Sequence, residues 1–193
     1  MIPARQKLID YHNVGEALAD LCGGLCSHDG ACLKCEHVDP PEMPAPLRRL
    51  LVHHDHMTTK LGDHFGRAVE LEVVEHELDG DLYRRKIMLK LAGTHDVVEF
   101  GVVRIDLSYT SDAVREEILQ RRTPLGDILI RHNVLRRVEP RWYLRVSSGC
   151  PMFSEAIVTP TADTFGRVGT IYCNDRPAIE LLEVVTGVSV GRT

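Results

Sequence analysis

One arginine lies among apolar residues in the most regular strand-like segment of the sequence. In residues 82–91, period-two alternation puts Arg85 on the same face as Tyr83, Ile87 and Leu89. A guanidinium keeps its charge, and leaving it unpaired in a core costs several kcal/mol. Arg85 therefore needs an anionic partner, either a bound ligand or a protein carboxylate. The carboxylates that we consider for this role are Glu75, Glu180 and Glu183.

A second group of residues that could do chemistry is a cluster of cysteines near the N-terminus. Four of the 6 cysteines fall within fourteen positions, with two histidines between or beside them. Thiolates and imidazoles suit tetrahedral zinc, although the spacing is not that of a standard zinc ribbon. A structural zinc is favoured over a redox or disulfide role and over no joint role. The four predicted metal ligands are Cys22, Cys26, Cys32 and Cys35.

The elements that must position these residues follow from the apolar pattern. Three strand-like runs at 67–78, 82–91 and 97–107 are separated by turn residues and predict an antiparallel meander. Two short helices are expected in 46–66, and a further pair at 111–122 and 123–132. Further strands are expected around 141–146, 166–173 and 177–185. The fold class is therefore α+β, an antiparallel sheet with flanking helices.

The chain is long enough for one domain and a short appendage. Its 193 residues are 44% apolar, and a proline-rich spacer precedes Leu47. We expect an extension over 1–46, consisting of a helix at 3–22 and the cysteine-rich and proline-rich segments, and a main domain over 47–193. We also expect a cytoplasmic protein, because no apolar run approaches a membrane span and no signal-peptide pattern occurs.

Composition argues against several classes of function. The net charge is -5 with both signs interspersed, so the basic stripe that nucleic acids require is absent. No glycine-rich phosphate loop or repeated βαβ unit occurs, which argues against dinucleotide binding and phosphoryl transfer. We expect a small-molecule partner, with no nucleic acid and no membrane span, and leave a homodimer open.

The order of motifs over residues 47–185 resembles the chorismate pyruvate-lyase family. No single motif is specific, and their order and spacing carry the resemblance. These are Leu50-Leu51 followed by Asp55, Met57 and Thr58; the strand Arg85 to Leu89; Thr123-Pro124-Leu125-Gly126; Gly166-Arg167; and Arg176-Pro177 before a last strand. The resemblance implies an antiparallel sheet of about six strands, flanking helices and an enclosed ligand pocket.

The resemblance also implies an activity and a set of site residues. Enzymes of this family convert chorismate to 4-hydroxybenzoate and pyruvate without a metal or organic cofactor. By this resemblance, Arg85 holds the ring carboxylate and the backbone N–H of Met57 reaches the ligand. Further substrate-binding residues by the same resemblance are Thr58, Leu125 and Gly126.

Two departures from the family pattern change the expected site. Leu182 stands where the family has its glutamate. A one-residue bulge in this strand would bring Glu183 to the ligand, whereas a regular strand would present Glu180 instead. We favour Glu183 as the catalytic carboxylate beside Arg85. Val102 stands where the family has a second arginine, so we expect Arg104 to take its place.

The sequence therefore predicts a carbon–oxygen lyase that eliminates pyruvate from chorismate. A dry cavity with two arginines and a carboxylate suits this reaction, which must orient a dianion and move one proton. Two alternatives remain open. One is a non-catalytic module of the same fold that binds a small aromatic carboxylate, and the other is a lyase for a related enolpyruvyl or aromatic acid.

Overall fold

Seven strands of the described chain form one antiparallel sheet in the order β1-β5-β6-β7-β4-β3-β2. The computed structural model describes residues 7–23, 25, 34–150 and 162–188. The strands are β1 (Cys35–Val38), β2 (Val69–Asp79), β3 (Leu82–Leu91), β4 (Val97–Asp106), β5 (Arg136–Val146), β6 (Thr164–Cys173) and β7 (Arg176–Val185). The predicted α+β class is confirmed, with seven strands where the resemblance implied about six.

The predicted meander is present as β2, β3 and β4. A tight turn at Gly80 and Asp81 joins β2 to β3, and Gly80 has a φ of 59°, a left-handed conformation that glycine adopts without a steric penalty. Tyr83, Ile87 and Leu89 all belong to one apolar cluster, whereas Met88 belongs to the cluster on the other face. The alternation predicted for this strand is therefore confirmed.

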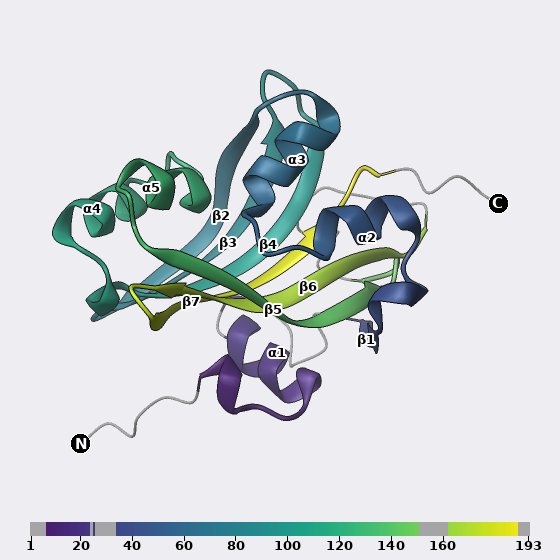
Figure 1. Cartoon of the computed structure of the whole chain (residues 1–193), viewed down its shortest axis with the longest axis horizontal. Coiled ribbons are helices and arrows are strands. Elements are labelled where there is room, and N and C mark those ends of the chain that lie inside the picture. Colours follow the sequence, from purple (N-terminus) through teal and green to yellow (C-terminus); the bar gives the residue numbers. More distant parts are fainter. Residues whose placement is uncertain (1–6, 24, 26–33, 151–161, 189–193) are drawn as a thin grey trace.

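Four helices cover one face of the sheet (Figure 1). They are α2 (Ala45–Leu51), α3 (Met57–Phe65), α4 (Asp112–Gln120) and α5 (Leu125–Arg131). Ser111 caps α4, since its hydroxyl accepts a hydrogen bond from the Val114 N–H at 3.4 Å, and Pro124 precedes the first turn of α5. Both expected helix pairs are thus present.

The opposite face carries α1 (Val14–Cys22), which follows a short 3₁₀ turn at Leu8–Asp10 (Figure 1). The expectation of one continuous helix over 3–22 is wrong. Asn13 is extended, and its side chain accepts hydrogen bonds from the N–H groups of Gly15 and Glu16, so that a new helix begins at Val14. Residues 3–6 of the expected helix lie outside the described part of the chain.

Part of the expected N-terminal extension belongs to the main sheet. β1 pairs with β5, with Cys35 opposite Val146 and Val38 opposite Tyr143. Leu18 and Leu21 of α1 pack in one apolar cluster with Phe100 of β4. The N-terminal segments and the sheet consequently share a core.

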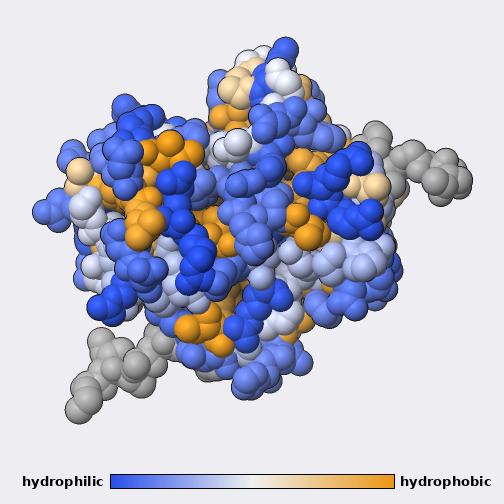
Figure 2. Space-filling view, viewed as in Figure 1, coloured by the Kyte–Doolittle hydropathy of each residue, from blue (hydrophilic) through white to orange (hydrophobic). Residues whose placement is uncertain are grey.

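The sheet separates two apolar cores. The larger lies under α2 to α5 and the smaller under α1. On the face that bears the four helices, apolar patches are broken up by hydrophilic residues (Figure 2). Among the described residues, no helix is long and apolar enough to cross a bilayer.

Candidate functional site

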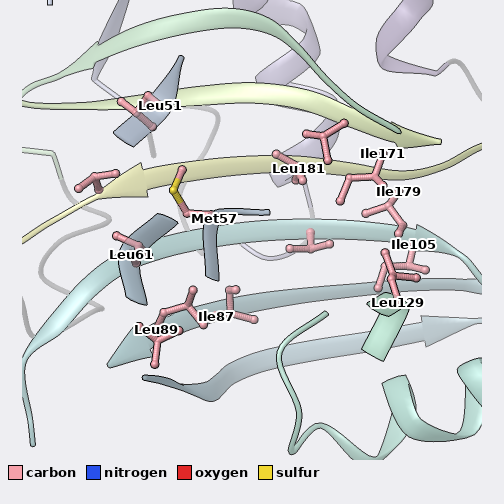
Figure 3. Close-up of a cluster of buried hydrophobic side chains, with 14 of the residues drawn as sticks. Leu51, Met57, Leu61, Ile87, Leu89, Ile105, Leu129, Ile171, Ile179 and Leu181 are labelled. Atoms are coloured by element: carbon pink, nitrogen blue, oxygen red, sulfur yellow. The ribbon is translucent and has the colours of Figure 1, made fainter. Parts of the chain in front are cut away.

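A small cavity lies between the sheet and the helices of the four-helix face. About 40 Å³ of it is open to the centres of water molecules, which is room for roughly three waters. Figure 3 shows the apolar part of its surroundings, with Ile87 and Leu89 on β3, Leu181 on β7 and Met57 at the start of α3. The polar residues of the lining are His56, Thr58, Arg85, Glu99 and Glu183.

Arg85 contributes an unsatisfied charge to this cavity. Its side chain is 0% exposed, and its Nε and Nη1 atoms have no hydrogen-bond partner in the described structure. Burial lowers the pKa of Arg85, an effect that the nearby Tyr83 hydroxyl opposes. No carboxylate among the described residues forms an ion pair with Arg85, so the structural ion pair considered in the sequence analysis is not observed.

The first turns of two helices form another wall. Met57 and Thr58 open α3, and Leu125 and Gly126 open α5, and all four residues line the cavity. Within α3, the first intrahelical bond runs from the Lys60 N–H to the His56 carbonyl, so the N–H groups before it have no acceptor inside the helix. These groups give the start of α3 a partial positive charge that favours an anion nearby.

Gly126 allows α5 to approach α3 closely. A Cβ atom at this position would lie 2.9 Å from Cγ of His56, so any larger residue would force the imidazole to move. The His56 ring is fixed on its other side, where Nε2 accepts a hydrogen bond from Arg136 Nε at 2.6 Å. Burial, followed by the charges of Arg136 and Arg167, lowers the pKa of His56 to about 4, so this ring is neutral at physiological pH.

Glu183 lines the cavity and is held by Arg167. Nε of Arg167 donates to a Glu183 carboxylate oxygen at 2.5 Å. The Nη1 atom of the same guanidinium donates to the carbonyls of Leu51 and His53, and Nη2 donates to the carbonyl of Asp55. Arg167 is therefore fully engaged, and it ties β6 and β7 to the loop between α2 and α3.

Arg104 and Glu180 lie on the other face of the sheet. Arg104 Nε donates to Glu180 at 2.5 Å, and its Nη1 pairs with Asp20 of α1. The other Glu180 oxygen accepts from the Leu8 N–H at 2.5 Å. Arg104 therefore lies away from the cavity. It is on the same face of the sheet as Val102, the face that carries α1. Arg85 pairs instead with Val103, which is on the other face.

Glu99 was not predicted as a site residue. This residue is 2% exposed, lines the cavity and stands in β4 between the buried residues Val98 and Phe100. A carboxylate inside the otherwise apolar run of residues 97–103 is a signal that the sequence already contained. His56 was also missed as a lining residue, and Arg167 was recognised as part of a motif but received no role.

The predicted zinc ligands are only partly within the described structure. Cys22 ends α1 and Cys35 begins β1, and both are free cysteines, while Cys26 and Cys32 lie outside the described residues. Within the described ranges, no group of three or more histidine, cysteine, aspartate or glutamate side chains could hold a metal ion. The expectation of a zinc protein therefore gains no support from the described residues, and a metal at the four cysteines stays a prediction.

Comparison with known proteins finds similarity in structure alone. No family model matches the sequence, and no curated protein matches it. PhnF from Mycobacterium smegmatis has a similar fold, with a TM-score of 0.52 and 12% identity over 75% of this chain and 72% of the PhnF chain.

Two weaker structural matches are named as an effector domain and a ligand-binding domain. The effector domain of the same PhnF has a TM-score of 0.47 and 10% identity, over 72% of this chain and 96% of the domain. The ligand-binding domain of a putative GntR-family transcriptional regulator from Bordetella bronchiseptica also has a TM-score of 0.47, with 12% identity over 62% of this chain and 86% of that domain.

The fold that this chain shares with PhnF corrects the functional part of the sequence analysis. It is the chorismate lyase-like fold without evidence for the lyase itself, and the predictions of a lyase, of an enzyme and of a role in aromatic acid biosynthesis are wrong. The geometry offers a physical reason. Chorismate is a dianion, whereas among the described lining residues Arg85 is the one cation without a carboxylate partner, since Arg104 lies on the other face.

Proposed function

We propose that this protein is a non-catalytic module that binds a small carboxylate, with an aromatic acid as the favoured class, in the cavity beside Arg85. The observation that carries the proposal is the unpaired guanidinium. Arg85 is completely buried and has two nitrogens without partners at the wall of a cavity. Because an unpaired charge in a protein interior costs several kcal/mol, an anion that reaches it gains a strong, desolvated interaction.

The surroundings of Arg85 support a partly apolar ligand. Ile87, Leu89 and Leu181 supply apolar wall, and the start of α3 adds a favourable dipole for an anion. With about 40 Å³ available, a ring-sized ligand enters only if the wall moves. The first turns of α3 and α5 are the wall elements that are not part of the sheet, so we expect them to make this adjustment.

Calorimetric titration with benzoate and 4-hydroxybenzoate tests the proposal. We expect binding to the wild-type protein, and we expect Arg85→Met to weaken it by about 2–5 kcal/mol, the usual loss when a desolvated charge-assisted contact is removed. Arg104→Met serves as the matched control, because Arg104 is also buried in the sheet but pairs with Glu180 and Asp20 on the other face. The folded fraction of the Arg104→Met variant should bind both acids as tightly as the wild type does.

Three results would contradict the proposal. One is equal binding by the wild type and the Arg85→Met variant, and another is no binding of either acid by the wild type. The third is the release of pyruvate from chorismate above the uncatalysed rate, which would show a catalytic rather than a binding site.

A further inference from the structure

Glu99 is a second buried polar group of the cavity with an unsatisfied atom. Its side chain is 2% exposed, and its Oε2 atom has no hydrogen-bond partner in the described structure. A buried carboxyl oxygen without a partner carries a desolvation cost, as does the Arg85 guanidinium. The two groups line the same cavity but do not pair with each other.

The register of the sheet explains why they stay apart. Arg85 lies opposite Val103, whereas Glu99 lies opposite Leu89, four residues further along β3. At about 3.3 Å per residue, the two positions are separated by roughly 13 Å along the strands. The cavity therefore has a cationic end at Arg85 and a carboxyl end at Glu99.

Among the described residues, no cation forms an ion pair with Glu99. In the described structure the nearby guanidinium, Arg167, donates to Glu183 and to backbone carbonyls of the loop between α2 and α3. Burial, followed by the negative charge of Glu183, raises the pKa of Glu99 well above its ordinary value, and Arg167 opposes this shift only in part. Burial at this position thus favours the protonated form of Glu99, which can donate a hydrogen bond.

We propose that Glu99 is a specificity-determining ligand contact, whose buried, unpartnered carboxyl group donates a hydrogen bond to a neutral oxygen at the end of the ligand remote from its carboxylate. This inference rests on the proposed function and narrows the ligand to a monocarboxylic acid with a hydroxyl or carbonyl oxygen at its far end. Charge balance supports this class. With such a ligand bound, its carboxylate neutralises Arg85, Arg167 neutralises Glu183, and the remote ligand oxygen satisfies the unpartnered carboxyl oxygen of Glu99.

Three probes that differ only at the position opposite the carboxylate test this inference. They are benzoate, 4-hydroxybenzoate and 4-(aminomethyl)benzoate, which carry hydrogen, a hydroxyl and an ammonium group. We expect the wild-type protein to bind 4-hydroxybenzoate about tenfold more tightly than benzoate, as one hydrogen bond to a buried donor provides. We expect the ammonium probe to bind more weakly than either, because an uncharged Glu99 cannot neutralise it.

Two variants test whether Glu99 is the source of this preference. Glu99→Gln keeps the shape and an N–H donor, so it should rescue most of the preference for the hydroxyl probe. Glu99→Leu removes the donor, so the affinity ratio of the two acids should fall to about one. Calorimetry in buffers of different ionisation enthalpy should show no proton release when 4-hydroxybenzoate binds.

The outcomes separate this inference from the proposed function. If benzoate binds and Arg85→Met abolishes its binding, the proposed function stands. The role of Glu99 is then overturned if the wild type shows no hydroxyl preference, if the ammonium probe binds best, or if Glu99→Gln loses the preference. If Glu99→Leu does not fold, the wild-type ratios and Glu99→Gln still decide. If no probe binds the wild type, the proposed function fails first.

Discussion

Three buried arginines in one sheet differ in how their charges are satisfied. Arg104 pairs with Glu180 and Asp20, and Arg167 pairs with Glu183 and with the backbone of a loop. Arg85 lies on the same sheet with no such partner among the described residues. Two of these arginines are therefore structural, whereas the third keeps its charge available at a cavity.

This difference predicts opposite effects on stability. Arg85→Met should raise the free energy of unfolding of the ligand-free protein by about 1–4 kcal/mol, because it removes an unpaired buried charge. Arg104→Met should lower it by about 3–5 kcal/mol, because Glu180 is then left buried without its cation. Urea denaturation of both variants measures this contrast. A destabilised Arg85→Met variant would show that Arg85 has a structural partner.

Glu99 predicts a dependence of stability on pH. Its pKa is raised in the folded state, so the folded protein holds a proton that the unfolded chain loses above about pH 4.5. Its contribution to stability is complete below that pH and decreases as the pH rises toward the folded-state pKa, by at most about 1.4 kcal/mol per pH unit.

Glu99→Gln should remove this dependence. The advantage of the variant over the wild type in unfolding free energy should therefore grow between pH 5 and pH 8, as denaturation at several pH values would measure. A constant difference across that range would mean that Glu99 is ionised in the folded protein.

At the scale of elements, the cavity is closed by the contact between the starts of α3 and α5. His56, immediately before α3, packs against Gly126 in the first turn of α5, and Arg136 of β5 fixes the imidazole from the other side. Arg167 holds the loop before α3 through the carbonyls of His53 and Asp55. The wall is thus positioned by a few specific contacts.

Gly126→Ala should disrupt this wall. The added methyl group would lie 2.9 Å from His56 Cγ, and the displacement should cost about 1–3 kcal/mol of stability and weaken the binding of carboxylates. Gly62→Ala is the matched control in the middle of α3, where the nearest atom to a new Cβ is 3.6 Å away. It should stabilise the protein by about 0.5–1 kcal/mol, since alanine is the better helix former. Thermal unfolding and titration with benzoate measure both variants.

At the scale of the whole molecule, the sheet separates binding from support. The four-helix face contains the cavity, and the α1 face contains a second apolar core and the ion pairs of Arg104. Residues of α1 do not line the cavity. A change on the α1 face should therefore alter stability without altering the site.

Leu21→Ala tests this separation, because Leu21 is completely buried in the core beneath α1. Loss of its side chain should lower the free energy of unfolding by about 2–5 kcal/mol. The affinity of the folded protein for benzoate should stay within about twofold of the wild-type value, since separated sites act independently. A large loss of affinity in fully folded Leu21→Ala would instead indicate coupling between the two faces.

Local patterns in the sequence determined the elements and one half of the site. The alternation in residues 82–91 put Arg85 on the apolar face, and this feature depends on neighbours a few residues away, so sequence spacing was sufficient to predict it. Met57 and Gly126 were expected at the ligand site from the family resemblance, and both line the cavity.

The tertiary structure decided which carboxylates and arginines lie on the face of the sheet that contains the cavity. In β7, Ile179 lies opposite Ile171 and Pro177 lies opposite Tyr172, so an extra residue at Ala178 changes the alternation of the strand. Glu183 consequently faces the cavity and Glu180 the α1 core, where it meets Arg104. The face of a side chain depends on bulges and on pairing with distant strands, and a one-residue shift exchanges the two faces. For the same reason, the absence of a carboxylate partner for Arg85 among the described residues emerged only from the folded chain.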